Sequence, residues 1–342
     1  MSLEEGMAKL ELNTPESVGE MIKSTLESIK CADIKSTSSK VPQPMFLEEE
    51  QAPAEAFHKM ANMSVRACPV RSGAGPELIG TLDLRDTVKF FVEESKRENK
   101  TPKDDASFDP NLKLMGWEKS EAIKGILHHP EVKKAEKSLK YLAKMRPFQV
   151  FAPEDSLVQV ASALAHGKHI VGISGGPPET AGLSKIITQR MLFQALAQSL
   201  QKVKMTVEEI MTSPVHTIPC TATAFDGFNL MATKDVSGVA VVDEDGCIIH
   251  NMSSKDMKLW VAHKEVAKGV QEASVEDFLS AVRRDGPKEK TRVPVCTCHK
   301  TDTIGHVAGM LASTGYHHMW VVEDKHPIGV ISLTDIFKRL LK

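Results

Sequence analysis

The stretch DVSGVAVVDEDGCIIHNMSSKDMKLW, from Asp235 to Trp260, is the part of the sequence that best indicates the fold. Its apolar run Val239 to Val242 predicts a buried strand, and the acidic residues and glycine that follow predict a tight turn. A second strand comes next, and the polar residues SSKD then lead into a helix. Asp256 therefore stands at the start of a helix that follows a strand–turn–strand unit.

The same order of elements recurs near the C-terminus, in HMWVVEDKHPIGVISLTDIFKRLL. The amphipathic helix before it, TDTIGHVAGMLASTG, has Thr303 as a candidate N-cap. A further copy surrounds HIVGIS and SKIITQRMLFQAL, and another extends from AEAFHKMANMSVRACPV to ELIGTLDLRDTVKFFVEES. Because an internal repeat determines the whole architecture, we predict an α/β (α+β) fold of four tandem β-α-β-β-α repeats, with small mixed sheets covered by helices.

The polar and charged segments between the copies set the predicted domain boundaries. These are an N-terminal lead at 1–28, repeat 1 at 29–95, a polar and helical linker at 96–143, repeat 2 at 144–202, repeat 3 at 203–266, and a connecting helix with repeat 4 at 267–342.

Composition excludes several classes of protein. The net charge of −2 gives no global signal for binding nucleic acid or a membrane surface. No run of 18 apolar residues is present, and the N-terminus is acidic, so we expect neither a membrane span nor a secretory signal. The 6 cysteines lack the spacing of a disulfide scaffold. The predicted location is the cytoplasm, the nucleus or both.

The repeat resembles the CBS (cystathionine β-synthase) domain, which pairs into Bateman modules. Four copies resemble more closely the gamma subunit of AMP-activated protein kinase and its yeast Snf4-type relatives. The stretches that carry the resemblance are SVRACPV and IGTLDLRD in repeat 1, RPFQVFAPEDSL in repeat 2, DVSGVAVVDEDG in repeat 3, and CTCHKTDTI, YHHMWVVED and GVISLTDIF in repeat 4. The resemblance implies two Bateman modules, repeats 1 with 2 and 3 with 4, in a flattened pseudo-symmetric disc.

The resemblance also implies a nucleotide cleft between the two repeats of a module. A carboxylate at a helix start can accept hydrogen bonds from the 2′- and 3′-hydroxyls of a ribose, and the first-turn N–H groups stabilise its charge. Asp86, Asp256 and Asp335 match this ribose position, whereas repeat 2 has Met191, which cannot accept such bonds. Capping the helix is the alternative role for each aspartate.

Phosphate contacts are expected from the residues just before the first strand of each hairpin, and Arg66 matches the family's phosphate arginine. Repeat 4 has His318 where the family often has Arg, and a neutral imidazole attracts phosphate less than a guanidinium does. Repeat 1 has Asp83 where Ser or Thr is usual, and this second carboxylate would repel phosphate. Helix capping is an equal alternative for Thr221 and Thr303. The other candidate contacts are Ser253 with Ser254, Ser332, Thr334, Lys168, His169, Arg190 and His317.

Two other signals are weaker. Cys296, Cys298 and His299 lack the second ligand cluster that a zinc site needs. The glycine-rich GISGGPPETAG lacks the Gly-Lys-Ser/Thr of a P-loop. An enzyme that uses either of them is a remote alternative, and we predict no enzymatic activity.

The resemblance therefore implies a regulatory subunit that binds AMP, ADP or ATP as regulatory ligands. Its expected partners are the catalytic alpha and scaffold beta subunits of an AMPK/Snf1-type protein kinase, with no nucleic acid and no membrane. A homodimer of the free chain is left open. The alternative is a standalone four-repeat protein that binds adenosyl ligands and controls a target other than this kinase.

Overall fold

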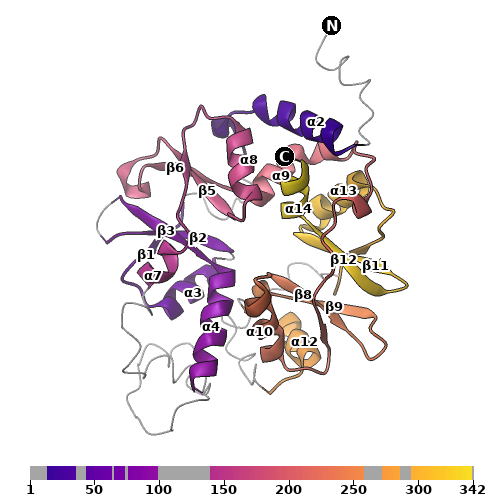
Figure 1. Ribbon diagram of the computed structural model, residues 1–342. Coiled ribbons are helices and arrows are strands. Elements are labelled where there is room, and N and C mark those ends of the chain that lie inside the picture. The colour runs from indigo at the N-terminus through magenta and orange to yellow at the C-terminus, as the bar shows by residue number, and fades with distance from the viewer. Residues whose placement is uncertain are drawn as a thin grey trace. The chain divides into compact units, whose positions relative to one another are not determined.

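Four three-stranded sheets, one in each predicted repeat, form the framework of the part of the chain that this computed structural model describes (Figure 1). The described residues are 14–35, 44–63, 65–73, 76–98, 139–257, 272–285 and 294–340. They divide into two compact units. Unit 1 lies within Met1–Met45, Phe148–Val215 and Val295–Lys342, and unit 2 lies within Phe46–Pro147 and His216–Pro294.

Every sheet has the same topology, in which a short first strand pairs parallel with the first strand of a hairpin. The hairpin strands pair antiparallel, and a bulge interrupts each hairpin at the same position. The strands are β1 Leu47–Glu48, β2 Ala67–Arg71 and β3 Leu78–Asp83 in repeat 1; β4 Val150–Phe151, β5 Ile170–Ser174 and β6 Leu183–Thr188 in repeat 2; β7 Thr217–Pro219, β8 Gly238–Val242 and β9 Ile248–Ser253 in repeat 3; and β10 Thr297–Cys298, β11 His318–Glu323 and β12 His326–Ser332 in repeat 4.

One helix precedes each hairpin and another follows it. The preceding helices are α3 Pro53–Asn62, α8 Leu157–Ala165, α10 Ala224–Lys234 and α13 Ile304–Thr314. The closing helices are α4 Leu84–Glu98, α9 Gln189–Leu200 and α14 Leu333–Leu340, and in repeat 3 the description reaches only the first turn, residues 254–257. The remaining helices are α2 Pro15–Glu27, α7 Leu139–Lys144 and α12 Val275–Asp285, with 3-10 turns at Cys31–Asp33, Pro178–Thr180 and Val207–Glu209.

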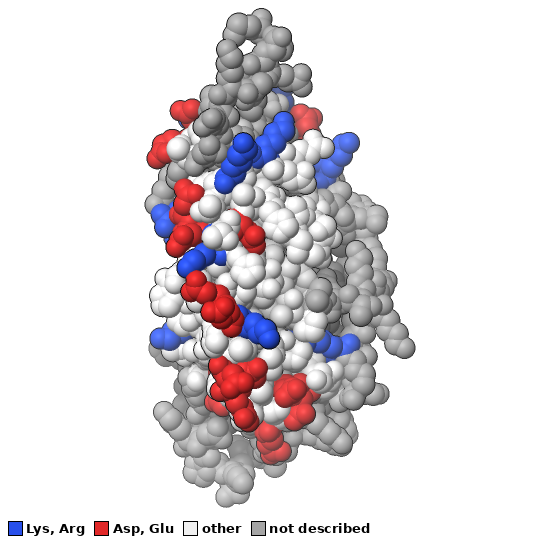
Figure 2. Space-filling model, turned by 90° about the vertical axis from the view of Figure 1, so that its right-hand side faces the viewer, with Lys and Arg blue, Asp and Glu red and all other residues white. Residues whose placement is uncertain are grey.

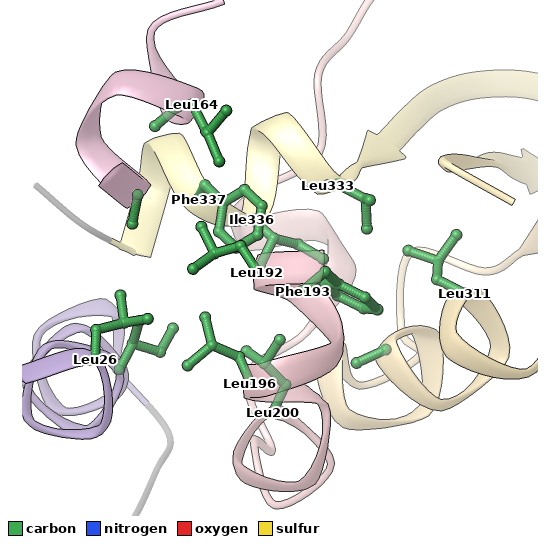
Figure 3. Close-up of a cluster of buried hydrophobic side chains, with 14 of the residues drawn as sticks. Leu26, Leu164, Leu192, Phe193, Leu196, Leu200, Leu311, Leu333, Ile336 and Phe337 are labelled. Atoms are coloured by element: carbon green, nitrogen blue, oxygen red, sulfur yellow. The ribbon is translucent and has the colours of Figure 1, made fainter. Parts of the chain in front are cut away.

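The core of unit 1 is a helical layer shared by repeats 2 and 4, to which α2 adds an apolar face. Figure 3 shows Leu196 and Leu200 of α9 beside Leu26 of α2, with Ile336 and Phe337 of α14 above them. All five side chains are completely buried. The burial of such large apolar groups explains why an N-terminal helix outside any repeat is part of the fold.

The core of unit 2 combines repeats 1 and 3 in the same manner. Val88 and Phe91 of α4 belong to one cluster with Phe228 of α10 and Phe278 of α12. The rings of Phe228 and Phe278 meet edge to face, with centroids 5.6 Å apart. In both units, therefore, helices of alternate repeats share a core.

The segment that leads into each repeat packs on a different repeat, and we call these segments leaders 1 to 4 (residues 30–35, 139–147, 203–215 and 272–285). Leader 1 bonds to repeat 2 through Cys31 N and the Asp155 carbonyl at 3.2 Å, and leader 2 bonds to repeat 1. Leader 3 bonds to repeat 4, and leader 4 packs on repeat 3 through the isolated bridge between Thr223 and Ser274. Repeats 1 and 2 thus exchange leaders, and so do repeats 3 and 4.

The predicted mixed α/β architecture of small sheets built from repeated units is confirmed. α2 lies in the predicted N-terminal lead, and α12 is the predicted connecting helix. Most of the predicted linker at 96–143 lies outside the described residues, although α7 near its end is helical as expected. The grouping of the repeats into two Bateman modules stays a prediction.

Candidate functional site

The aspartate of repeat 4 lies in a turn that joins β12 to α14. Ser332 donates to Oδ2 of Asp335 through its backbone N at 2.8 Å and also through its hydroxyl. The backbone N of Asp335 donates in return to Ser332 Oγ at 3.2 Å. This reciprocal pair is a capping box, in which Ser is the cap and Asp reaches back from the third helical position. The cap accounts for only one of the two carboxylate oxygens of Asp335.

Repeat 3 builds the same turn between β9 and its closing helix. Oδ2 of Asp256 accepts hydrogen bonds from the backbone N of Ser253 at 2.6 Å and from the Ser253 hydroxyl at 3.0 Å. Burial raises the pKa of Asp256, and the bonds from Ser253 partly offset that rise. Within the described residues, Oδ1 of Asp256 has no hydrogen-bond partner, and neither Asp256 nor Asp335 forms an ion pair. Both repeats thus present a half-buried carboxylate with capacity for further donors.

The second oxygen of Asp335 meets a residue that the sequence analysis missed. The hydroxyl of Thr212, in leader 3, donates to Oδ1 of Asp335 at 2.7 Å. The backbone of Thr212 is fixed by a pair of 2.9 Å hydrogen bonds with Val330 in β12. Its side chain is exposed, so the hydroxyl can turn away from the carboxylate when another donor arrives. The signal for this residue was the similarity between MTSP in leader 3 and MRP in leader 2.

Repeat 1 differs because its aspartate is paired with an arginine. Nε of Arg146, in leader 2, lies 2.8 Å from Oδ1 and 2.7 Å from Oδ2 of Asp86. Asp83 occupies the position of Ser332, and its backbone N donates to Asp86 Oδ2 at 3.2 Å. Oδ1 of Asp83 accepts from the backbone N of Arg85 at 2.9 Å and from its Nε at 3.1 Å. Burial raises the pKa of Asp86, against the lowering effect of Arg146.

Repeat 2 has no carboxylate at this position. Met191 is 6% exposed and belongs to the core, and its backbone N donates to the N-cap Thr188 at 3.2 Å. Two residues earlier, the buried Gln189 donates through Nε2 to the carbonyl of Leu164 at 2.9 Å and to Thr334 Oγ1 at 3.2 Å. At the helix start of repeat 2, Met191 therefore packs in the core at the position where repeats 3 and 4 have an aspartate, and Gln189 makes hydrogen bonds that hold the helix in place.

The residue just before each hairpin is held next to the start of the closing helix by one backbone hydrogen bond. The bonds run from Leu84 N to Arg66 O, Gln189 N to His169 O, Ser254 N to Ser237 O, and Leu333 N to His317 O, at 2.9 to 3.3 Å. Arg66, His169 and His317 therefore occupy one equivalent position. In its own repeat, each is bonded to the residue that stands two positions before the ribose position. His318 is one residue further, at the first position of β11, where its ring packs edge to face on Trp320 with centroids 5.2 Å apart.

Burial has a clear effect on Arg66. Burial lowers its pKa, with a further lowering by Arg85 that Asp83 opposes. Its Nε is buried and has no hydrogen-bond partner among the described residues. Arg66 is therefore a donor with unused capacity beside the crowded helix start of repeat 1.

The remaining candidates have mostly local roles in the described structure. Thr303 caps α13 by accepting from His306 N at 3.2 Å, so the capping alternative is observed for it. The cap of α10 is Thr223 and not Thr221, which lies two residues earlier and is exposed. Arg190 donates to the carbonyl of Gly315 at the end of α13 at 2.9 Å. Lys168 lies beside His169 in the turn before β5, and Ser254 is 2% exposed, with Oγ lacking a hydrogen-bond partner in the described part of the chain.

The cysteine and histidine residues of CTCH do not form a metal-binding arrangement within the described residues. Cys296 and Cys298 are buried, and burial raises the pKa of Cys298 to about 12. No group of three or more His, Cys, Asp or Glu side chains is placed to share a metal ion within the described ranges. Of the helices that the structure describes, none combines the length and apolar character that a membrane crossing requires.

Comparison with known proteins identifies two of the repeats. Residues 207–262 and 288–342 match the CBS domain. Over 190 residues, 52% of this chain and 35% of the relative, the chain is 25% identical to Protein SDS23 of Meyerozyma guilliermondii. Over 114 residues, 32% of this chain and 26% of the relative, it is 26% identical to the SNF1-related protein kinase regulatory subunit gamma-1-like of Arabidopsis thaliana. The chain thus aligns with about a third or less of the length of these curated relatives.

One solved structure has a similar fold along most of the chain. Protein MJ1225 from Methanocaldococcus jannaschii, described as a proposed archaeal homolog of g-AMPK, superposes with a TM-score of 0.62 and 15% identity. The alignment covers 91% of this chain and 99% of that chain. The predicted resemblance to CBS-domain proteins of the AMPK gamma type is confirmed: two stretches of the chain match the CBS domain, the chain is similar in sequence to SDS23 and to a gamma-type subunit, and its fold is similar to that of MJ1225.

Proposed function

We propose that this protein is a nucleotide-sensing regulatory subunit that binds AMP, ADP and ATP at the closing-helix starts of repeats 3 and 4. Asp256 and Asp335 each accept hydrogen bonds from the 2′- and 3′-hydroxyls of the ribose. The protein then alters the activity of a partner according to which nucleotide is bound, because the bound nucleotide favours one conformation or one complex over another.

One observation carries the proposal, which is the arrangement around Asp335. A carboxylate fixed by a capping box with Ser332 has its other oxygen directed at the hydroxyl of Thr212, 2.7 Å away. Hydroxyl donors at such an oxygen are what a ribose diol supplies, and charge-assisted hydrogen bonds of this kind are short and strong. A diol that approaches Asp335 replaces or joins Thr212 without leaving an unpaired buried charge.

The rest of a nucleotide has complementary groups nearby. In repeat 4, His317 lies beside the helix start, where an imidazole can donate to a phosphate oxygen, and the N–H groups of the first turn of α14 add partial positive charge. Lys168 and His169 supply the corresponding cations in repeat 2, although that repeat lacks the carboxylate. The adenine ring requires an apolar surface next to the ribose position.

The proposed partners are the catalytic alpha and scaffold beta subunits of an AMPK/Snf1-type kinase, with the protein itself acting without catalysis, in the cytoplasm, the nucleus or both. The similarity to a plant SNF1-related gamma-type subunit supports this choice. The longer alignment to Protein SDS23 favours a second candidate, a standalone regulator of a target other than this kinase. Adenine-nucleotide binding belongs to both candidates.

Isothermal titration calorimetry with AMP, ADP and ATP tests the binding. We expect the full chain to bind at least one of them, and Asp256→Ala and Asp335→Ala each to remove or weaken one site. Met191→Leu is the matched control, because it changes the equivalent position of repeat 2, keeps the volume of this core side chain and should leave binding unchanged. Wild-type protein that binds none of the three nucleotides would refute the proposed function.

Affinity capture with purified kinase alpha and beta subunits separates the two candidates. Retention of the full chain by the alpha–beta pair, in a manner that AMP or ATP alters, is the result expected for the kinase subunit. No retention at micromolar concentrations, by a protein that does bind nucleotide, would leave the standalone regulator as the function.

A further inference from the structure

We propose that Arg146 is a built-in occupant of the ribose position of repeat 1, so that Asp86 binds no nucleotide while this arginine is present. This inference rests on the proposed function, because it assigns the specificity of the equivalent position in a further repeat. The residue that each leader places beside the aspartate of the repeat on which it packs then determines whether that aspartate is open to a ribose. A small hydroxyl leaves the carboxylate open, and an arginine closes it.

The equivalence of Arg146 and Thr212 follows from backbone hydrogen bonds. Val330 N donates to the carbonyl of Thr212, and Thr81 N donates to the carbonyl of Arg146, both at 2.9 Å. Val330 and Thr81 are themselves equivalent, since each follows the glycine that faces the bulge of its hairpin. Leaders 2 and 3 therefore deliver one residue each to the aspartate of the repeat on which they pack.

A glycine in the sheet permits this approach in repeat 1. A Cβ atom on Gly80 would lie 1.9 Å from the carbonyl oxygen of Ala143, at the end of α7. The backbone of leader 2 thus passes so close to β3 that no side chain fits between them. The carbonyl oxygen of Arg146 would itself lie 3.1 Å from that Cβ atom, and it accepts the hydrogen bond from Thr81 N, so the fold fixes the backbone of Arg146 against β3.

The chemistry at the two aspartates differs because the leader residues differ. Nε of Arg146 contacts both oxygens of Asp86, at 2.8 and 2.7 Å, which are the two atoms that a ribose diol would use. Thr212 contacts one oxygen of Asp335 with a neutral and exposed hydroxyl. A guanidinium neutralises the carboxylate. Because it belongs to the same chain, its effective concentration at Asp86 is high, and a nucleotide must compete with it to bind there.

A second observation points to the same conclusion. Repeat 1 has two buried carboxylates three residues apart, with Asp83 2% exposed and Asp86 7% exposed. Neighbouring carboxylates of this kind require cations, and Arg85 and Arg146 supply one to each. Asp83 stands where repeats 3 and 4 have a serine, so repeat 1 differs from them both in its cap residue and in the residue that leader 2 places beside the aspartate. The two ion pairs, Arg85 with Asp83 and Arg146 with Asp86, balance both carboxylates without a ligand.

The test is a reciprocal exchange of the two leader residues, measured by calorimetric titration of the full chain with AMP. Arg146→Thr should add one site per chain, and Arg146→Thr combined with Asp86→Ala should remove that added site. Thr212→Arg should eliminate one of the sites of the wild-type protein. Asp86→Ala alone should leave the number of sites unchanged.

Loss of a site in Asp86→Ala alone would overturn the inference, and so would a folded Arg146→Thr that gains none. Circular dichroism establishes whether Arg146→Thr is folded. If that variant is unfolded, Thr212→Arg provides the test: a Thr212→Arg protein that retains every wild-type site would contradict a closing role for arginine. The outcome for the proposed function is separate. Binding by Arg146→Thr but not by wild-type protein would sink the proposed function and retain this inference, and binding by neither would refute both.

Discussion

Removing Arg146 should destabilise the protein far more than removing its partner Asp86. The side chain of Asp86 is 8% exposed and that of Arg146 is 27% exposed. Arg146→Ala leaves a carboxylate without a cation in a nearly closed site, which costs about 3–5 kcal/mol in folding free energy for buried pairs. Asp86→Ala leaves an arginine that can extend into solvent, so we expect a cost of about 1 kcal/mol.

Urea unfolding of the two single variants and of the double variant measures this asymmetry as a double-mutant cycle. Because the penalty in Arg146→Ala comes from the unpaired Asp86, the double variant should be more stable than Arg146→Ala alone. Equal losses for the two single variants, or a double variant less stable than both, would refute the assignment of Asp86 as the buried member of the pair.

The pH dependence of Arg146→Ala gives an independent check. Burial already raises the pKa of Asp86 in the wild-type protein, and loss of Arg146 removes a cause that lowers it. A carboxyl whose pKa is higher in the folded than in the unfolded state binds more protons when folded, so stability falls as pH rises above about 4 through the folded value. The penalty of Arg146→Ala should therefore be small at acidic pH and reach its maximum at neutral pH.

Three further changes test other parts of the account. Asp335→Asn should weaken AMP binding at one site about 100-fold in calorimetry, because it removes two charge-assisted hydrogen bonds that contribute about 1.5 kcal/mol each. Thr212→Val should change the affinity of that site by less than about tenfold, since it removes only a hydroxyl that orients the carboxylate. Phe337→Ala should lower the free energy of unfolding by about 3–5 kcal/mol in chemical denaturation, because this completely buried ring fills the core of unit 1. As a control for Phe337→Ala, Met145→Ala should change the free energy of unfolding by less than about 0.5 kcal/mol, because Met145 is 64% exposed.

The repeated architecture could be predicted because its determinants are local. Apolar strands, a turn and a polar helix start follow one another within about 25 residues, so the pattern is visible in each copy. The capping turn at Asp256 and Asp335 has the same origin, since Ser253 and Ser332 lie three residues before the aspartates that they contact. For Thr221 the sequence left helix capping and ligand contact open, and the structure excludes capping because the cap of α10 is Thr223, two residues later.

The leader contacts could not be predicted in the same way. Arg146 and Asp86 are 60 residues apart, and Thr212 and Asp335 are 123 residues apart. No local pattern shows on which repeat a leader packs, because that choice depends on which sheet edge has space for it, as at Gly80. The sharing of one core by helices of alternate repeats is likewise a tertiary property, since the apolar faces of α9 and α14 do not specify their partners.

A crystal structure of the full chain grown with AMP is the most direct test of the central claim. The account predicts ribose hydroxyls within hydrogen-bonding distance of Asp256 or Asp335, and Arg146 still paired with an Asp86 that contacts no nucleotide. Nucleotide held by Asp86 with Arg146 displaced, or by the helix start at Met191, would contradict it.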